Sequence, residues 1–198
     1  MLDRAFAVSV AVFSLGVLTG ALTVLVLPGF RDVALVTFEI RMLAPMRTVC
    51  EFGRMAMFLF IFLNNSIAPA LSFLYPYLVA KVRWTPPLTA QREQFFMGAF
   101  TVLASFLIGF FALGAGLAVA WELKGANGLL LLLSGAWLHG PLEFLSVLLC
   151  VAEPLRLVWR NQTRAVDFAS TLRRDLRLMW SSLLGLLFAA AFEVFLGI

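Results

Sequence analysis

The single histidine of the chain stands one helical turn before a carboxylate, inside a strongly apolar stretch. His139 and Glu143 are four residues apart in "LHGPLEF", a spacing that puts both side chains on one face of a helix. They can share a hydrogen bond as neutral groups or pair as imidazolium and carboxylate. Between them, Gly140 exposes the backbone, and Pro141 lacks the N–H that would bond the carbonyl of Trp137. Such a turn is costly in lipid, so we expect a kinked turn that faces protein or water.

A second polar group lies in "FLFIFLNNSIAPA", where Pro69 frees the backbone carbonyl of Asn65. A third acid, Glu193 in "AAAFEVFLGI", comes close to the end of the chain. Ionisable groups in membrane spans tend to face the bundle interior or a water-filled cavity. We therefore predict a buried polar cluster made of five side chains: Asn64, Asn65, His139, Glu143 and Glu193.

Two uses of this polar cluster are open at the level of sequence. Its side chains can act as interhelical hydrogen bonds that hold the helices together, or they can handle a ligand, an ion or a proton. Glu193 taken alone can instead reach water from its place near the end of its helix.

The composition indicates that these residues lie in a membrane protein. Of 198 residues, 62% are hydrophobic, and the mean hydropathy is +0.98, whereas soluble domains are about 45–50% apolar. The net charge of +4 is dispersed, so no basic surface for nucleic acid is expected. One histidine cannot complete a zinc-protease ligand set, and the sequence has no Gly-x-Ser-x-Gly motif. We expect no enzyme, no metal and no cofactor.

Five stretches have the roughly 20 apolar residues that a membrane helix needs. The fold class is therefore an all-α membrane protein with one polytopic domain over residues 1–198. The first span is expected to be retained rather than cleaved as a signal peptide, because its apolar run is too long. The second and fourth spans are expected to be kinked at their prolines. The spans are about 5–27, 55–80, 95–121, 127–153 and 179–197.

The distribution of basic residues predicts the orientation in the cell membrane. Ten Lys and Arg residues lie at the N-terminus, the second loop and the fourth loop, against five on the opposite side. Because cytoplasmic loops carry the excess of positive charge, we expect the N-terminus in the cytoplasm and the C-terminus outside.

Two connecting segments have the pattern of interfacial structure. Apolar residues recur with a helical period through 155–176, and Arg156, Arg160 and Arg164 follow at four-residue steps. This pattern predicts an amphipathic helix with a basic face at the inner head groups, with a solvated charged loop as the alternative. The segment 31–54 is expected to be an outer-surface helix, a re-entrant segment or a docking site for a partner.

Glycines mark places where helices can come close. "GVLTG", from Gly16 to Gly20, is a GxxxG motif that suits packing within one subunit or between subunits. Gly109, Gly114 and Gly116 predict a further tight contact in the third span. The short "KGANG" makes spans three and four an antiparallel hairpin, with Gly125 as a helix C-cap.

This combination resembles the stage II sporulation protein M family of integral membrane proteins. The matching pieces are "FLNNSIAPA", "NG" at Asn127–Gly128, "LHGPLEFLSVLL" and "AAAFEVFL", over about residues 50–198. The chain departs from the family where glycines usually follow both central motifs, since "LSFLYPYLVA" and "CVAEPLRL" stand there instead. The resemblance implies a membrane protein with a polar core. The best-known member belongs to a complex that holds peptidoglycan-degrading partners during spore engulfment, and many relatives occur in organisms that do not sporulate.

The sequence therefore favours a membrane scaffold or complex subunit without catalytic activity. Its expected partners are the lipid bilayer, further copies of itself, and other membrane or cell-envelope proteins. The alternative is a pathway for a small solute, an ion or a proton, lined by the same polar cluster.

Overall fold

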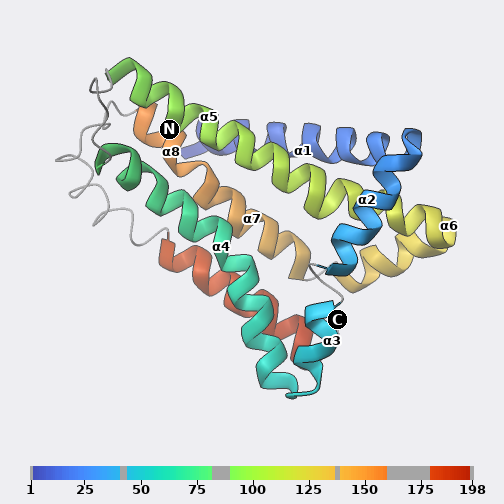
Figure 1. Cartoon of the computed structure of the whole chain (residues 1–198). Helices are drawn as coiled ribbons and strands as arrows, with labels where there is room; N and C mark the ends of the chain where they lie inside the picture. Colours follow the sequence, from blue (N-terminus) through green and yellow to red (C-terminus); the bar gives the residue numbers. More distant parts are fainter. Residues whose placement is uncertain (1, 41–43, 82–89, 137–138, 160–178, 197–198) are drawn as a thin grey trace.

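The computed structural model describes residues 2–40, 44–81, 90–136, 139–159 and 179–196, and these residues form helices without strands. A helix over 179–191 follows the last labelled α-helix and continues into the π-helix η3 (Figure 1). The labelled helices are α1 (Leu2–Val26), α2 (Pro28–Phe38), α3 (Ala44–Cys50), α4 (Arg54–Lys81), α5 (Ala90–Leu107), η2 (Ile108–Gly114), α6 (Ala115–Ala136), α7 (His139–Val151), α8 (Glu153–Trp159) and η3 (Phe192–Leu196).

Three helical stretches are long and apolar enough to cross a membrane: Arg4–Val26, Arg54–Tyr75 and Gln94–Leu130. Their lengths follow from nearly unbroken apolar sequence, and 25 residues of α1 extend about 37 Å at 1.5 Å per residue. The apolar helix Met179–Phe195 is shorter. The all-α membrane class is confirmed, whereas these described stretches do not establish five spans.

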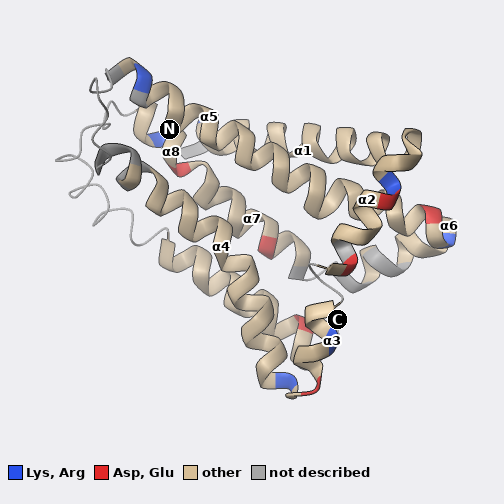
Figure 2. Ribbon diagram, in the orientation of Figure 1, with Lys and Arg blue, Asp and Glu red and all other residues tan. Residues whose placement is uncertain are grey.

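The polar ends of the helices gather at two ends of the molecule (Figure 1). The start of α1, the end of α4, the start of α5 and α8 lie together at one end. At the other end lie α2, α3, the turn within α6 and η3. Figure 2 shows acidic and basic residues mainly at these ends, with the long middle stretches of α1, α4 and α5 almost free of them. This distribution is what a bilayer imposes on spanning helices.

α5 and η2 follow each other directly and together form one rod. α1 packs closely against this rod, because both sides of the contact carry glycines. A Cβ atom added to Gly16 or Gly20 would collide with the backbone of Phe106 or Phe110. Added at Gly109, it would collide with the carbonyl of Phe13. The GxxxG motif of α1 thus packs within the chain. It lies against the part of the third span whose glycines predicted a tight contact.

Gly125 reverses the chain inside α6. Its backbone angles, φ 57° and ψ −141°, lie in a region that residues with a Cβ rarely adopt. The two arms on either side come close enough that a Cβ on Gly128 would collide with the carbonyl of Ala120. The predicted hairpin with Gly125 as its helix stop is confirmed.

The predicted fourth span, 127–153, is described in two stretches, because residues 137–138 lie outside the described residues. The described part of α6 runs to Ala136, and α7 is described from His139. The kink at Pro141 stays a prediction. By contrast, α4 stays helical through both Pro69 and Pro76.

α7 is the central helix of the bundle. Val147 and Val151 pack with Leu186 of the 179–191 helix, and α4, α5 and η2 supply the partly buried side chains around them. Gly185 allows close approach, because a Cβ there would collide with the hydroxyl of Ser146. α7 is therefore surrounded by other helices along most of its length.

Candidate functional site

Two carboxyl groups of the predicted polar cluster come together in the structure. Glu143, in the second turn of α7, and Glu193, in the π-helix η3, lie close enough to interact electrostatically. Both side chains are half-buried. No hydrogen bond to the carboxyl of Glu143 occurs among the described residues. Two acids from opposite ends of the sequence thus share one region, where like charges repel and a proton or a cation is favourable.

The turn that carries Glu143 is less enclosed than the sequence predicts. Gly140 is buried, but Pro141 is exposed. The side chain of His139 lies outside the described part of the structure, and with it the predicted pairing with Glu143.

The asparagine pair of α4 is bonded internally. The Asn64 side-chain amide donates to Oδ1 of Asn65 at 3.2 Å, and both side chains are half-buried. Pro69, one turn further on, is fully buried. Ser66 in the same stretch donates to the carbonyl of Phe62 at 2.7 Å. α4 packs along α7, although among the described residues no hydrogen bond links the asparagines to Glu143.

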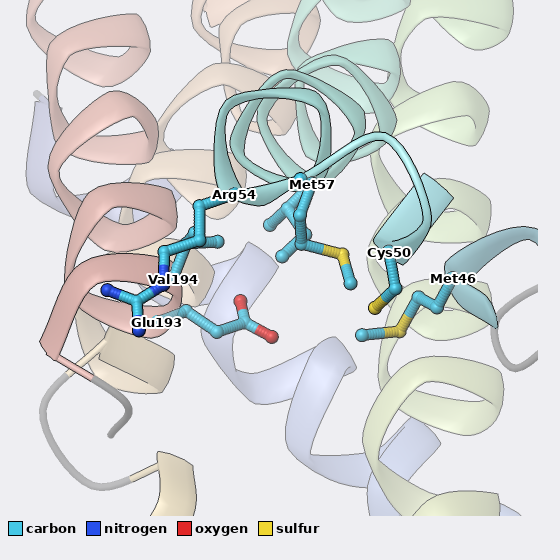
Figure 3. A pocket seen from close by; sticks show the side chains of 8 residues that line it. Met46, Cys50, Arg54, Met57, Glu193 and Val194 are labelled. Atoms are coloured by element: carbon cyan, nitrogen blue, oxygen red, sulfur yellow. The ribbon is translucent and has the colours of Figure 1, made fainter. Parts of the chain in front are cut away.

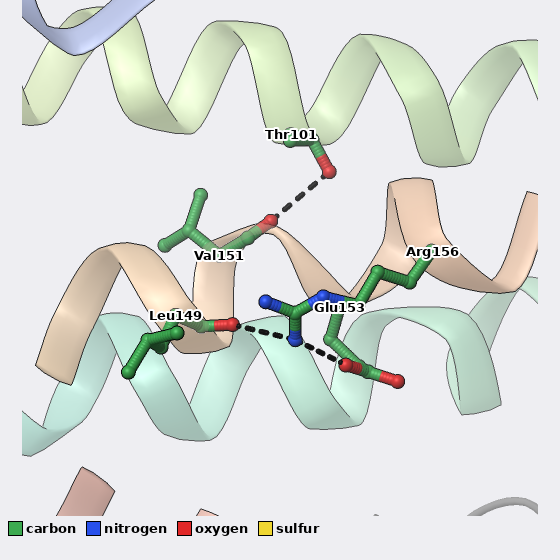
Figure 4. Close-up of polar contacts among 5 residues, drawn as sticks. All are labelled: Thr101, Leu149, Val151, Glu153 and Arg156. Carbon is green, nitrogen blue, oxygen red and sulfur yellow. Dashed lines mark hydrogen bonds and ion pairs between the residues drawn. The ribbon is translucent and has the colours of Figure 1, made fainter. Parts of the chain in front are cut away.

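The most buried charges lie where α7 passes into α8. Arg156 donates from Nη1 to Oε2 of Glu153 at 2.8 Å and to the carbonyl of Leu149 at 3.1 Å. Only 1% of the Arg156 side chain and 4% of the Glu153 side chain are exposed. Figure 4 shows the pair folded back against the end of α7. The predicted basic face at the head groups is therefore wrong for Arg156, because an acid three residues earlier draws it into the bundle. Arg160 and Arg164 lie outside the described residues.

Further buried hydrogen bonds tie neighbouring helices to one another. The hydroxyl groups of Ser9 in α1 and Ser105 in α5 are 2.8 Å apart. Thr101 of α5 donates to the carbonyl of Val151 at 3.0 Å, at the end of α7 (Figure 4). These bonds satisfy polar groups that would otherwise be unpaired in an apolar surrounding.

A pocket of about 460 Å³ opens beside Glu193 at the end of the molecule that carries α3 and η3. Figure 3 shows Glu193 with side chains of the α3–α4 hairpin around it. The lining residues are Met46, Cys50, Gly53, Arg54, Met57, Ile61, Glu193 and Val194. Among the described residues, no group of three or more His, Cys, Asp or Glu side chains is placed to hold a metal ion.

The family model of stage II sporulation protein M matches residues 9–197. The chain belongs to the stage II sporulation protein M family. The match extends the expected resemblance, about 50–198, to nearly the whole chain, including the first span. Neither a search of curated proteins nor a search of solved structures found a match.

The buried Glu153–Arg156 pair is a feature of this family member that the sequence pattern did not predict. It lies in "CVAEPLRL", the segment that replaces the glycines expected of the stage II sporulation protein M family. Cys150 to Leu157 are buried without exception. The sequence does contain a signal for this pair, because an acid and a base stand three residues apart next to an apolar run. The arginines that follow at four-residue steps favoured a surface helix instead.

Proposed function

We propose that this protein is a multi-pass scaffold or complex subunit of the cell membrane, without catalytic activity. The observation that supports this best is the use of its buried polar groups. Ser9 with Ser105, Thr101 with the Val151 carbonyl, and Arg156 with the Leu149 carbonyl all join one helix to another. Buried polar groups that hold helices together are suited to a protein that presents fixed surfaces to its partners.

The surface best suited to a partner is the outer face of α2. Phe30, Val33 and Val36 of α2, followed by Ile40 just beyond its end, recur at three- and four-residue steps, and all four are exposed. The opposite face is anchored, since Ala34 and Leu35 pack against the core around Val24 and Ala115. An exposed apolar stripe on an anchored helix is typical of a docking surface. Because the family name refers to a stage of sporulation, which remodels the envelope, we propose another cell-envelope protein as partner, together with further copies of this chain.

Native electrophoresis of mild detergent extracts from the source membranes tests this proposal. The wild-type chain should migrate in an assembly that also contains a second envelope protein. Val33→Asp should release that partner while the bundle stays folded, because the Val33 side chain is 58% exposed. Leu123→Asp is the matched control, since Leu123 is 67% exposed on α6 and should leave the assembly intact. A wild-type assembly made of this chain alone, or one that survives Val33→Asp, overturns the proposal.

A second candidate is a pathway for protons or cations, favoured by the approach of Glu143 to Glu193 next to a pocket. Neighbouring carboxyl groups attract a positive charge, as polar groups inside transport proteins do. Purified protein in liposomes decides between the two functions. The pathway requires a proton or cation flux that Glu143→Gln abolishes, whereas the scaffold predicts the same leak with wild type, Glu143→Gln and empty liposomes.

A further inference from the structure

Three sulfur-containing side chains from two helices line the pocket beside Glu193. α3 and α4 form a helical hairpin whose turn contains Gly53, with a φ of 90°. Met46 and Cys50 are four residues apart and therefore lie on one face of α3, while Met57 lies in the first turn of α4. All three line the pocket, and Figure 3 shows their sulfur atoms turned toward the same space.

The ligand types select a soft metal ion. Thiolate and thioether sulfur prefer Cu(I), whereas magnesium and calcium prefer oxygen ligands. The Glu193 carboxylate points into the pocket from the side of η3 and supplies negative charge, while the guanidinium of Arg54 extends away from the sulfur atoms (Figure 3). We propose that this pocket binds Cu(I) through the sulfur atoms of Met46, Cys50 and Met57.

Binding at this site exchanges a proton for the metal ion without electron transfer. The sulfur of Cys50 bonds Cu(I) as its thiol proton leaves to solvent, and the two thioethers donate lone pairs without losing a proton. Cys50 is exposed, so the ion has an entry from water. Ile61, which is 6% exposed, lines the pocket on the α4 side. This site goes beyond the proposed scaffold function and does not depend on it.

Anaerobic titration of the purified full chain with Cu(I), in competition with a chromogenic Cu(I) chelator, tests the proposal. The wild type should bind one equivalent, and Cys50→Ser should abolish this step. Met57→Leu should weaken the affinity at least about tenfold, because even partners outside the ligand shell are worth 10–100-fold. Two controls should bind as the wild type does: Cys150→Ser, which removes a buried thiol elsewhere, and Met55→Leu, whose side chain is 62% exposed in the same turn as Met57.

Protection of Cys50 from alkylation gives a second measurement on folded protein. One equivalent of Ag(I), used as a soft-ion probe, should block maleimide labelling of Cys50 in the wild type and in Met55→Leu, and much less in Met57→Leu. Equal block in Met57→Leu and in the wild type would mean that the cysteine binds the ion alone, which overturns the site. Wild-type affinity for Cu(I) in both Cys50→Ser and Met57→Leu would overturn it as well.

Discussion

Arg156 and Glu153 carry opposite charges into a part of the molecule that water hardly reaches. Desolvation costs several kcal/mol per ion, and their attraction offsets it only when the geometry is good. Nη1 of Arg156 has two acceptors, but Nε and Nη2 have no hydrogen-bond partner among the described residues. The pair therefore adds little net stability, yet each charge depends on the other.

Removing one member of this pair should be much worse than removing both. Glu153→Gln leaves the buried guanidinium without its counter-charge and should lower the free energy of unfolding by about 3–5 kcal/mol. The double variant Glu153→Gln/Arg156→Met should recover most of that loss. Chemical unfolding in detergent micelles measures both.

The exposed pair of Arg47 with Glu39, 4.0 Å apart, provides the control for this prediction. Arg47→Met should change the free energy of unfolding by less than about 1 kcal/mol. If Glu153→Gln costs no more than Arg47→Met, the pair is not buried as described.

At the scale of single residues, the sequence identifies unusual residues more reliably than it predicts their positions in the fold. Glu143 and Glu193 were both singled out, and the structure brings them together although 50 positions separate them in the chain. Arg156 was placed on the wrong side of its helix, because a helical period fits a buried acid–base pair and a surface basic face equally well. Met46 and Met57 were missed, since methionines in apolar sequence look like ordinary core residues.

The packing of α1 on the α5–η2 rod is decided by backbone contact between the elements. Gly16 and Gly20 on one side, and Gly109 and Gly114 on the other, let each backbone approach the other closely. The rod becomes a π-helix over Ile108–Gly114, within this contact. Because neither backbone can move aside as a side chain can, the interface tolerates no added atoms.

Gly109→Ala should therefore destabilise the bundle, by about 1–3 kcal/mol, the usual cost of overpacking. Gly116→Ala is the matched control in the first turn of α6, directly after the rod, where an added Cβ meets no atom within 4 Å. It should be neutral or stabilising by up to about 1 kcal/mol, since alanine is the better helix former. Thermal unfolding of both variants measures the difference, and equal stability of the two would contradict the close packing.

Helices and their stops could be read from the sequence where local chemistry dominates. The apolar runs of α1 and α4 and the stop at Gly125 follow from length and glycine alone. The partner of the GxxxG motif could not be read, because small residues look the same in contacts within and between chains. Gly116 was expected in the tight contact and is not there.

The molecule as a whole has the polarity of a membrane protein, with apolar lengths between two polar ends (Figure 2). Composition predicts this much, because no soluble core of this size can hide so many apolar side chains. The orientation of the chain in the membrane is inferred from the distribution of its basic residues. We propose, on that basis, a cytoplasmic N-terminus.

Labelling of the two native cysteines tests this orientation. Cys50 is exposed at the end of the molecule that should lie outside, and Cys150 is buried. A membrane-impermeant maleimide should label Cys50 in intact cells and leave Cys150 untouched, with Cys50→Ser as the control that loses the signal. Labelling that appears only after the cells are broken open would reverse the orientation.

The inward placement of the Glu143 carboxyl is central to the polar interior of the bundle, and spin labels in lipid bilayers measure that placement directly. In a background without native cysteines, labels at Glu143→Cys and Glu193→Cys together should show strong dipolar broadening. A label at Leu145→Cys, where the native side chain is 48% exposed, should be far more accessible to oxygen in the lipid phase than one at Glu143→Cys. Equal lipid accessibility at 143 and 145, with no broadening between 143 and 193, would place the acid against acyl chains and contradict its inward placement and the ion pathway.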